Sequence, residues 1–189
     1  IPCLADAVVN PQLGPEPHAR FCGAGVAYQL AAALLGADTA TQWLDLAAFA
    51  TIADIVPLLE ENRALVALGL PRIGERPGLR ALMDTAGCRQ PINAETVAYQ
   101  LAPRVNAAGR IADADISVRL LLARDAADAE PLARALDAAN TERKRLETQA
   151  TAQAAQQAEN HDFVRRRMLF VRGTDWSAGV VGLVAGRLN

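Results

Sequence analysis

Apolar residues recur every three to four positions through most of this chain, the spacing that buries one face of an α-helix. Two short apolar runs lack that spacing and have the length of buried strands, Ala7–Val9 and Met168–Val171. The pattern therefore predicts an α/β chain in which helices dominate. The helices it predicts cover residues 26–35, 40–51, 60–70, 79–86, 93–101, 111–123, 126–160 and 179–188.

The segment 126–160 is the longest predicted helix. It consists mainly of Ala, Leu, Glu, Gln, Arg and Asp, with few apolar anchors, which favours a largely solvated helix. At ~1.5 Å per residue it is a rod of about 50 Å, long enough to join two domains across a cleft. We therefore expect a first domain at 1–125, a connecting helix at 126–160, and the opening βα unit of a second domain at 161–189.

Composition excludes several classes of protein. With 189 residues, 51% hydrophobic and 21% charged, the chain has the make-up of a folded domain and not of a disordered one. A net charge of −2 argues against a generally basic nucleic-acid coat, so any phosphate site needs a local cluster of cations. Asp45 and Asp54 divide the longest apolar candidate, and neither a membrane span nor a signal peptide is predicted.

The three cysteines, Cys3, Cys22 and Cys88, are odd in number and lack the spacing of a zinc site. This usage favours buried packing roles and a reducing, cytoplasmic compartment. Because the chain begins with Ile1 and stops at Asn189 soon after a glycine-rich apolar run, we expect it to be a piece of a longer protein.

The segment Pro103–Arg110 carries two arginines, an amide and a glycine, and Pro103 predicts that a helix ends there in a loop. The guanidinium fork of an arginine matches a phosphate group and stays charged at any biological pH. One interpretation is a phosphate site formed by Arg104, Asn106 and Arg110, with Gly109 allowing a turn that aims a backbone amide at the same oxygens. A capping and salt-bridging cluster is the equally weighted alternative.

Asp54 interrupts the apolar run 51–58. A lone buried carboxylate is costly unless a metal, an arginine or helix-start amides compensate it. A cap or a salt bridge is the commoner explanation of such an acid, and a metal ion would require further ligands. His18 and His161, the two histidines, are most simply solvated surface residues.

Three further stretches have both a functional and a structural interpretation. Residues 143–145 alternate with Glu142 and Glu147, which favours ordinary ion pairs within a helix. The arginine run 165–167 is more strongly basic, yet its place before a predicted strand fits an exposed loop. Ser177 and Gly179 open the last helix, where backbone amides could face an anion or small residues could allow tight packing.

Taken in order, these segments resemble the RecJ family of single-stranded-DNA exonucleases, in the DHH phosphoesterase superfamily. The resemblance runs almost end to end, and its specific motifs are the Asp54 segment and the arginine segment. Its other matching stretches are 5–11, 23–27, 61–65, 76–79 and 176–187.

The resemblance implies a fold and a set of roles. Residues 1–125 would be the C-terminal part of a DHH-type domain, and 161–189 the start of a DHH-associated α/β domain. Asp54 would be a ligand of a Mn²⁺ or Mg²⁺ pair completed by residues before Ile1. Substrate phosphate would be held by Arg104, Asn106, Gly109, Arg110, Ser177 and Gly179.

The activity implied is metal-dependent 5′–3′ exonuclease cleavage of single-stranded DNA in DNA repair and recombination, with replication or repair proteins as further partners. The residues alone leave the polarity open. The isolated chain is expected to be inactive, because the Asp-His-His motif would precede Ile1. Asp54 is expected to share one cavity with Arg104 and Arg110.

Two departures from the family pattern bear on the substrate. Ser177 stands where the family usually has His, and Ala50 where it usually has Gly. The alternatives are a DHH-type phosphodiesterase of short oligonucleotides or cyclic dinucleotides, and a non-catalytic relative that keeps the scaffold to bind proteins.

Overall fold

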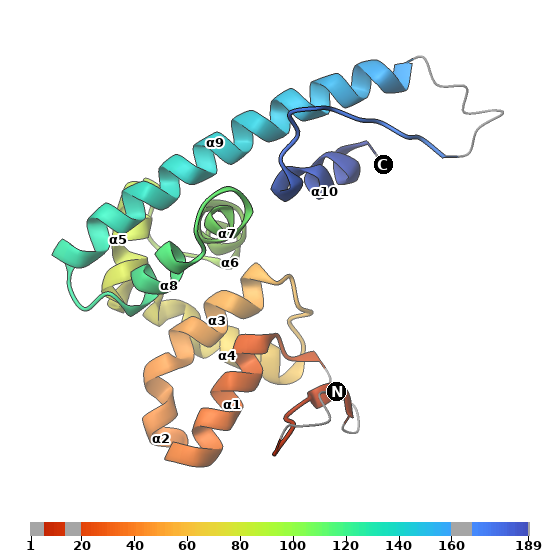
Figure 1. Ribbon diagram of the computed structural model, residues 1–189. Helices are drawn as coiled ribbons and strands as arrows, with labels where there is room; N and C mark the ends of the chain where they lie inside the picture. Colours follow the sequence, from red (N-terminus) through yellow and green to blue (C-terminus); the bar gives the residue numbers. More distant parts are fainter. Residues whose placement is uncertain (1–5, 14–19, 160–167, 189) are drawn as a thin grey trace.

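The computed structural model describes residues 6–13, 20–159 and 168–188, which form helices joined by turns (Figure 1). No strand occurs within these ranges, so the predicted α/β class is wrong for them. Both predicted strands, Ala7–Val9 and Met168–Val171, lie in irregular backbone. The apolar runs were identified correctly as non-helical, but a strand also needs a neighbouring strand to pair with its backbone groups. His18, His161, Cys3 and the arginine run 165–167 lie outside the described residues.

Directly after the second apolar run, the Gln157 side chain bonds to the backbone as a neighbouring strand would. The Gln157 Nε2 group donates to the Arg172 carbonyl oxygen at 2.8 Å, and the Arg172 N–H donates to Gln157 Oε1 at 3.1 Å. One amide thus satisfies both backbone groups of Arg172. This pairing attaches the extended segment to the long helix without a sheet.

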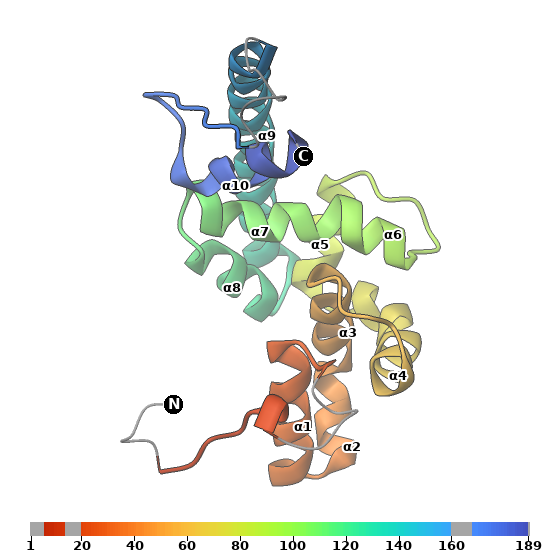
Figure 2. The ribbon, with the colours of Figure 1, turned by 90° about the vertical axis from the view of Figure 1, so that its right-hand side faces the viewer.

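The N-terminal part of the molecule is a small helical bundle, drawn in red to golden yellow in Figure 2. Helix α4 packs closely on α3 at Gly69. A Cβ atom at this position would lie 2.3 Å from the Leu44 carbonyl oxygen, so only a glycine fits there. Helix α1 begins at Cys22, whose Sγ accepts the Gly25 N–H, and ends at Gly36, whose φ of 89° few other residues adopt. The elements are η1 (Pro11–Leu13), α1 (Gly23–Leu35), α2 (Ala37–Ala40), η3 (Thr41–Trp43), α3 (Leu44–Ala53) and α4 (Glu60–Gly69).

The middle of the chain forms a second helical layer and the main core. The largest fully buried side chains gather here, among them Leu79, Leu82, Leu101, Leu120 and Leu136. The elements are η4 (Leu70–Glu75), α5 (Pro77–Thr85), α6 (Ala94–Thr96), the π-helical turn η5 (Val97–Leu101), α7 (Ala102–Ile111) and α8 (Asp115–Leu122).

An ion pair joins the two layers. Arg76, at the start of α5, donates through Nη2 to Asp45 Oδ1 of α3 at 2.9 Å and through Nη1 to the Leu121 carbonyl oxygen at 3.4 Å. Asp45 is buried, so this arginine supplies the compensation that a buried carboxylate needs.

The segment predicted to be an arginine loop is helical. Pro103 does not end the helix, because it occupies the first turn of α7, where a missing N–H leaves no bond unmade. The chain enters α7 through η5, whose wider π-helical turn precedes the proline. The four predicted site residues of this segment therefore lie at different angles around one helix and do not converge from a loop. They are Arg104, Asn106, Gly109 and Arg110.

Helix α9 (Ala126–Glu159, 34 residues) agrees with the helix predicted at 126–160 and runs along one side of the molecule (Figure 1). Pro131 lies in its second turn. One stripe of α9 is buried at intervals of three, four and seven residues, as expected for an amphipathic helix. Its members are Ala129, Ala133, Leu136, Asn140, Glu147, Ala150 and Ala154.

Helix α10 (Ala178–Arg187) packs under the C-terminal half of α9, away from the main core (Figure 1). Ala150, Ala154 and Val184 form a small apolar cluster between the two helices, flanked by Val171, Trp176 and Leu188. Among the described residues, no helix is both long enough and apolar enough to cross a membrane.

Candidate functional site

A groove of about 1070 Å³ lies between four elements: the end of α3, the η5–α7 segment, α9 and α10. Its α9 residues run from Arg143 to Ala155, beyond the part of α9 that enters the main core and alongside the small cluster beneath α10. Apolar residues of α3 and η5 form one wall, and charged residues of α7, α9 and α10 form the others.

The groove is rich in cations although the chain is slightly acidic. Among the described residues that line it, Arg110, Arg143, Lys144 and Arg187 are basic, and Glu147 is the only acid. The chain as a whole has a net charge of −2. This is the local cationic cluster that phosphate binding would require, and three helices contribute to it.

Arg110 is the one predicted arginine that lines the groove. Its Nη1 donates to the Gly179 carbonyl oxygen at 3.2 Å, which joins the end of α7 to the start of α10. A Cβ atom on Gly179 would lie 2.0 Å from the Arg110 carbonyl oxygen, so Gly179 is needed for close packing. Ser177 caps α10, its Oγ accepting the Gly179 N–H at 3.3 Å. The tight-packing interpretation of this segment is the one these contacts support.

Arg104 is directed elsewhere. Its Nε donates to Asp137 Oδ1 of α9 at 2.8 Å, and its Nη1 donates to the Gln100 carbonyl oxygen at 2.5 Å. It is absent from the groove lining, so the expectation that it shares a cavity with Arg110 is wrong. This contact is the salt-bridging alternative weighed for the segment. Asn106 lines the groove, whereas Gly109 is an exposed position inside α7.

Asp54 ends helix α3 at the edge of the groove. Its neighbours Ala53 and Ile55 line the groove, but the Asp54 side chain itself is exposed and outside the lining. The expected burial of this carboxylate is therefore wrong. Within the described residues no hydrogen bond or ion pair engages the carboxylate, and a negative charge at a helix C-terminus is unfavourable. Neither a cap at a helix start nor a salt bridge accounts for Asp54 there.

The backbone turn after Asp54 is strained. The Val56 N–H donates to the Thr51 carbonyl oxygen at 3.3 Å and the Ile55 N–H to that of Ile52 at 3.1 Å, which is a Schellman turn. Ile55 holds the left-handed position, with φ of 55°, where glycine is usual, and its side chain is 87% exposed. A β-branched residue there costs on the order of 1–3 kcal/mol. Strain of this kind next to an unpaired acid points to a functional site.

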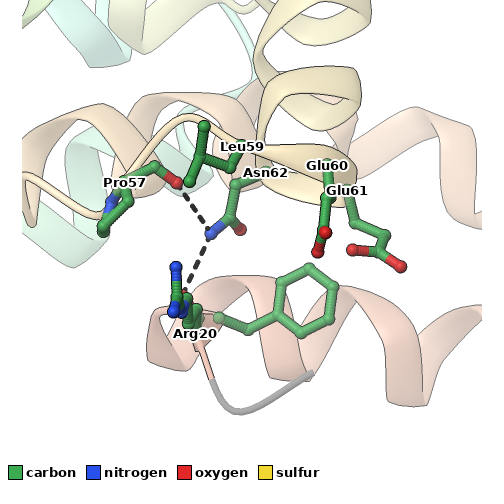
Figure 3. A pocket seen from close by; sticks show the side chains of 7 residues that line it. Arg20, Pro57, Leu59, Glu60, Glu61 and Asn62 are labelled. Atoms are coloured by element: carbon green, nitrogen blue, oxygen red, sulfur yellow. Dashed lines mark hydrogen bonds between the residues drawn. The ribbon is translucent and has the colours of Figure 1, made fainter. Parts of the chain in front are cut away.

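A second pocket, of about 90 Å³, lies on the far side of this turn (Figure 3). Its buried Asn62 donates through Nδ2 to the Pro57 carbonyl oxygen at 3.2 Å and to the Arg20 carbonyl oxygen at 3.0 Å. Figure 3 shows the amide between the two segments. Asn62 therefore holds the loop after Asp54 against the chain that enters α1.

The sequence interpretation missed most of the groove. Arg143, Lys144 and Glu147 were assigned to ordinary ion pairs within a helix, Arg187 was noted only as the end of a matching stretch, and Tyr99 was given no role. The ion pairs do form, since Arg145 binds Glu142 and Arg143 binds Glu147. A detectable signal was the polarity of positions 140 and 147, which interrupt a buried stripe made otherwise of Ala and Leu.

Two cysteines fall in the described residues, and both are free thiols. Cys22 is buried beside Thr51, and the partly buried Cys88 donates to Gln100 Oε1. Burial raises the pKa of the Cys88 thiol, an effect opposed by Arg104 and reinforced by Asp84. Over the same residues, no three His, Cys, Asp or Glu side chains cluster as a metal site would require.

Known proteins include close relatives of this chain. The chain is 43% identical over 187 residues to the single-stranded-DNA-specific exonuclease RecJ of Bacillus subtilis, a match that covers 96% of this chain and 24% of that protein. It is 39% identical over 186 residues to RecJ of Thermus thermophilus, covering 96% of this chain and 27% of the relative. The chain aligns with a segment of each of these two RecJ proteins.

The solved structures agree. RecJ of Thermus thermophilus in complex with Mn²⁺ superposes with a TM-score of 0.83 at 37% identity, over 94% of this chain and 27% of that one. The Mg²⁺ complex gives a TM-score of 0.84 over 95% of this chain and 29% of that one. The resemblance to RecJ predicted from the motifs is thus confirmed over nearly the whole chain, which spans about a quarter of these relatives. No family model matches the chain.

Proposed function

We propose that this chain is the groove-forming part of a RecJ-type exonuclease, which hydrolyses single-stranded DNA with Mn²⁺ or Mg²⁺ in the cytoplasm during DNA repair and recombination. The observation that carries the proposal is the cationic groove between α7, α9 and α10, in a chain that aligns over 96% of its own length with part of RecJ of Bacillus subtilis. A single strand offers such a groove a row of phosphates and accessible base faces.

Asp54 is the proposed metal ligand. It is an exposed carboxylate without a partner in the described residues, held beside the groove by a strained turn, and a hard divalent ion prefers such an oxygen ligand. The described residues provide no complete set of ligands, so other parts of the protein would supply the rest. When bound, the ions would lower the pKa of a water and stabilise charge on the phosphoryl group.

The cations would hold the strand while Tyr99 contacts a base. Arg110 of α7 and Lys144 of α9 both line the groove and can neutralise phosphate oxygens. Tyr99 lines the same groove from η5 with 79% of its surface exposed. An aromatic ring stacks on any base, so it favours single strands without selecting a sequence. Ser177 and Gly179 would act through the placement of α10 and not by touching phosphate.

The metal assignment is tested with Asp54→Asn in the complete protein. Loss of roughly 3 kcal/mol of charge stabilisation would slow hydrolysis of a labelled single strand about 100-fold or more. Asp38→Asn, an exposed acid on α2, is the matched control and should leave the rate unchanged. Full activity of Asp54→Asn with manganese would contradict the assignment.

The groove is tested by DNA binding. Arg110→Gln and Lys144→Gln should each weaken binding of a thymidine oligonucleotide and lower the slope of log affinity against log salt by about 0.7. Arg134→Gln, an exposed α9 cation paired with Glu130, should change neither quantity. Binding that is unaffected by both groove variants would refute the proposed nucleic-acid site, and would favour a scaffold that binds proteins.

A further inference from the structure

Two arginines in the groove wall, Arg143 and Arg187, are joined through the carboxylate of Glu147. Glu147 of α9 is buried, and its Oε2 accepts from Arg143 Nη1 at 2.6 Å while its Oε1 accepts from Arg187 Nε at 3.1 Å. Arg143 lies on α9 one turn before Glu147, whereas Arg187 ends α10. The carboxylate is therefore the polar link between two helices that meet at the groove.

Arg143 is fixed from a second side. The buried amide of Asn140 accepts from Arg143 Nε at 3.3 Å and from Arg143 Nη2 at 3.1 Å. With Asn140 and Glu147 one turn away on either side, the guanidinium is held in a single orientation and only 12% of the Arg143 side chain is exposed. An arginine ordered in this way loses little further entropy when it binds an anion.

Arg187 is oriented differently. Its side chain is 68% exposed, and the bond to Glu147 uses only its Nε. No bond from either Nη group is recorded within the described residues, so these groups remain available to a ligand in the groove that Arg187 lines. Two guanidiniums thus share one carboxylate, and a surplus of positive charge is left.

This network is a costly way to hold two helices together. Apolar side chains of similar volume usually stabilise a buried contact as well as an ion pair does. The same stripe of α9 is Ala and Leu up to position 136 and Ala at 150 and 154, and its two polar members, Asn140 and Glu147, are the residues that bond to the groove-lining Arg143. The position of the polar residues fits ligand binding better than it fits packing.

We propose that Glu147 is a positioning residue, which aligns Arg143 of α9 and Arg187 of α10 so that both engage one phosphodiester of single-stranded DNA. The inference rests on the proposed function, because it assumes that the strand occupies this groove. It adds that the seating of α10 on α9 and the binding of this phosphate depend on the same carboxylate.

The test is Glu147→Gln in the complete protein. It removes one negative charge, and the two explanations predict opposite changes in DNA affinity. Removing a carboxylate from a cationic groove should tighten DNA binding if electrostatics alone acts. If Glu147 positions the two arginines, binding of a thymidine oligonucleotide should instead weaken about tenfold, and the salt slope should fall by about 0.7 as one phosphate contact is lost. The matched control is Glu142→Gln, an exposed acid of α9 paired with Arg145, which should leave binding unchanged or slightly tighter.

A double-variant cycle separates positioning from folding. Arg187→Gln should weaken binding, and adding Glu147→Gln to it should weaken binding by much less than the tenfold seen alone, because the two act through one contact. Thermal melting identifies a variant that fails to fold. In that case Glu147→Asp, which keeps the charge but shortens the side chain, should give the same loss of affinity.

The outcomes separate this inference from the function on which it rests. If Arg110→Gln and Lys144→Gln weaken binding while Glu147→Gln tightens it or leaves it unchanged, the positioning role is wrong and the groove remains. If all three variants bind normally, the proposed function fails as well.

Discussion

The two halves of α9 are held in place by different means. The first half lies against α5, α7 and α8 and contributes Leu136 to the main core of large apolar side chains. The second half packs on α10, and its buried residues are Glu147, Ala150 and Ala154, of which the two alanines form the small apolar cluster with Val184. Burial of large apolar surface secures the first contact, whereas the second depends on close approach of small residues and on polar links.

The polar links of the second half come from α9 itself. Gln153 accepts from Trp176 Nε1 at 2.7 Å, Gln157 pairs with the Arg172 backbone, and Glu147 binds Arg187. Contacts of this kind contribute about 1 kcal/mol each, much less than a buried leucine. Helix α10 is therefore the more easily displaced wall of the groove, while α7 is fixed to the core.

The largest expected effect tests the first half of α9. Leu136→Ala should lower the free energy of unfolding by about 2–5 kcal/mol, because a fully buried leucine leaves a cavity. Val184→Ala, in the small cluster under α10, should cost only about 1.6 kcal/mol at ~0.8 for each buried methylene. Urea denaturation measures both changes. Equal losses of unfolding free energy in the two variants would show that the main core and the small cluster contribute equally to stability.

Gly179→Ala tests the close approach of α10. The new methyl group would lie 2.0 Å from the Arg110 carbonyl oxygen, so α10 must shift, at about 1–3 kcal/mol. Hydrogen exchange should show faster opening of the α10 amides with little change in α5 and α8. Gly182→Ala, whose methyl group would meet nothing within 4 Å, is the control and should leave α10 as stable or slightly more so. Unchanged α10 exchange in Gly179→Ala would contradict the packing role.

Gln153→Ala removes one polar link and should weaken the attachment of Trp176 by about 1 kcal/mol. Quenching of tryptophan fluorescence by acrylamide should increase, since Trp176 would leave the surface of α9 more often. Gln149→Ala provides the comparison, because the Gln149 Oε1 accepts from Arg145 of the same helix. Equal quenching in the two variants would show that the bond from Trp176 to Gln153 does not help to hold Trp176 on α9.

The smallest effect concerns Cys88, at the edge of the main core. Because burial raises the pKa of this thiol, it stays protonated at pH values where an exposed cysteine already forms thiolate. Alkylation by iodoacetamide at pH 8 should therefore be slower than in the urea-unfolded protein, and should accelerate in Leu136→Ala. Equal rates in the folded and unfolded protein would show that this end of the core is open.

The local pattern was sufficient to predict most helices. The segment 126–160 predicts α9 to within one residue because its composition and spacing are helical throughout. The predicted helix at 60–70 likewise corresponds to α4. The errors concern partners that the pattern does not contain. Met168–Val171 is apolar and extended, but the backbone of the next residue, Arg172, pairs with the Gln157 side chain and not with a strand.

The residues of the predicted site are only partly brought together by the fold. Asp54 and Arg110 were selected by residue type, and both lie at or beside the groove. Arg104 looked equivalent to Arg110 in the sequence. The helical rotation between positions 104 and 110 directs the first toward Asp137 and the second toward α10.

The sequence by itself determined the positions of the helices, the phosphate-matching residue types and the resemblance to RecJ, because these depend on short-range spacing and motifs. Only the tertiary structure decided which cations share a groove. Arg110, Arg143 and Arg187 come from three helices, and neither their separation along the chain nor their residue type reveals that they meet. The packing of α7 and α10 on α9 brings them together, and that packing is set by contacts between residues far apart in the chain.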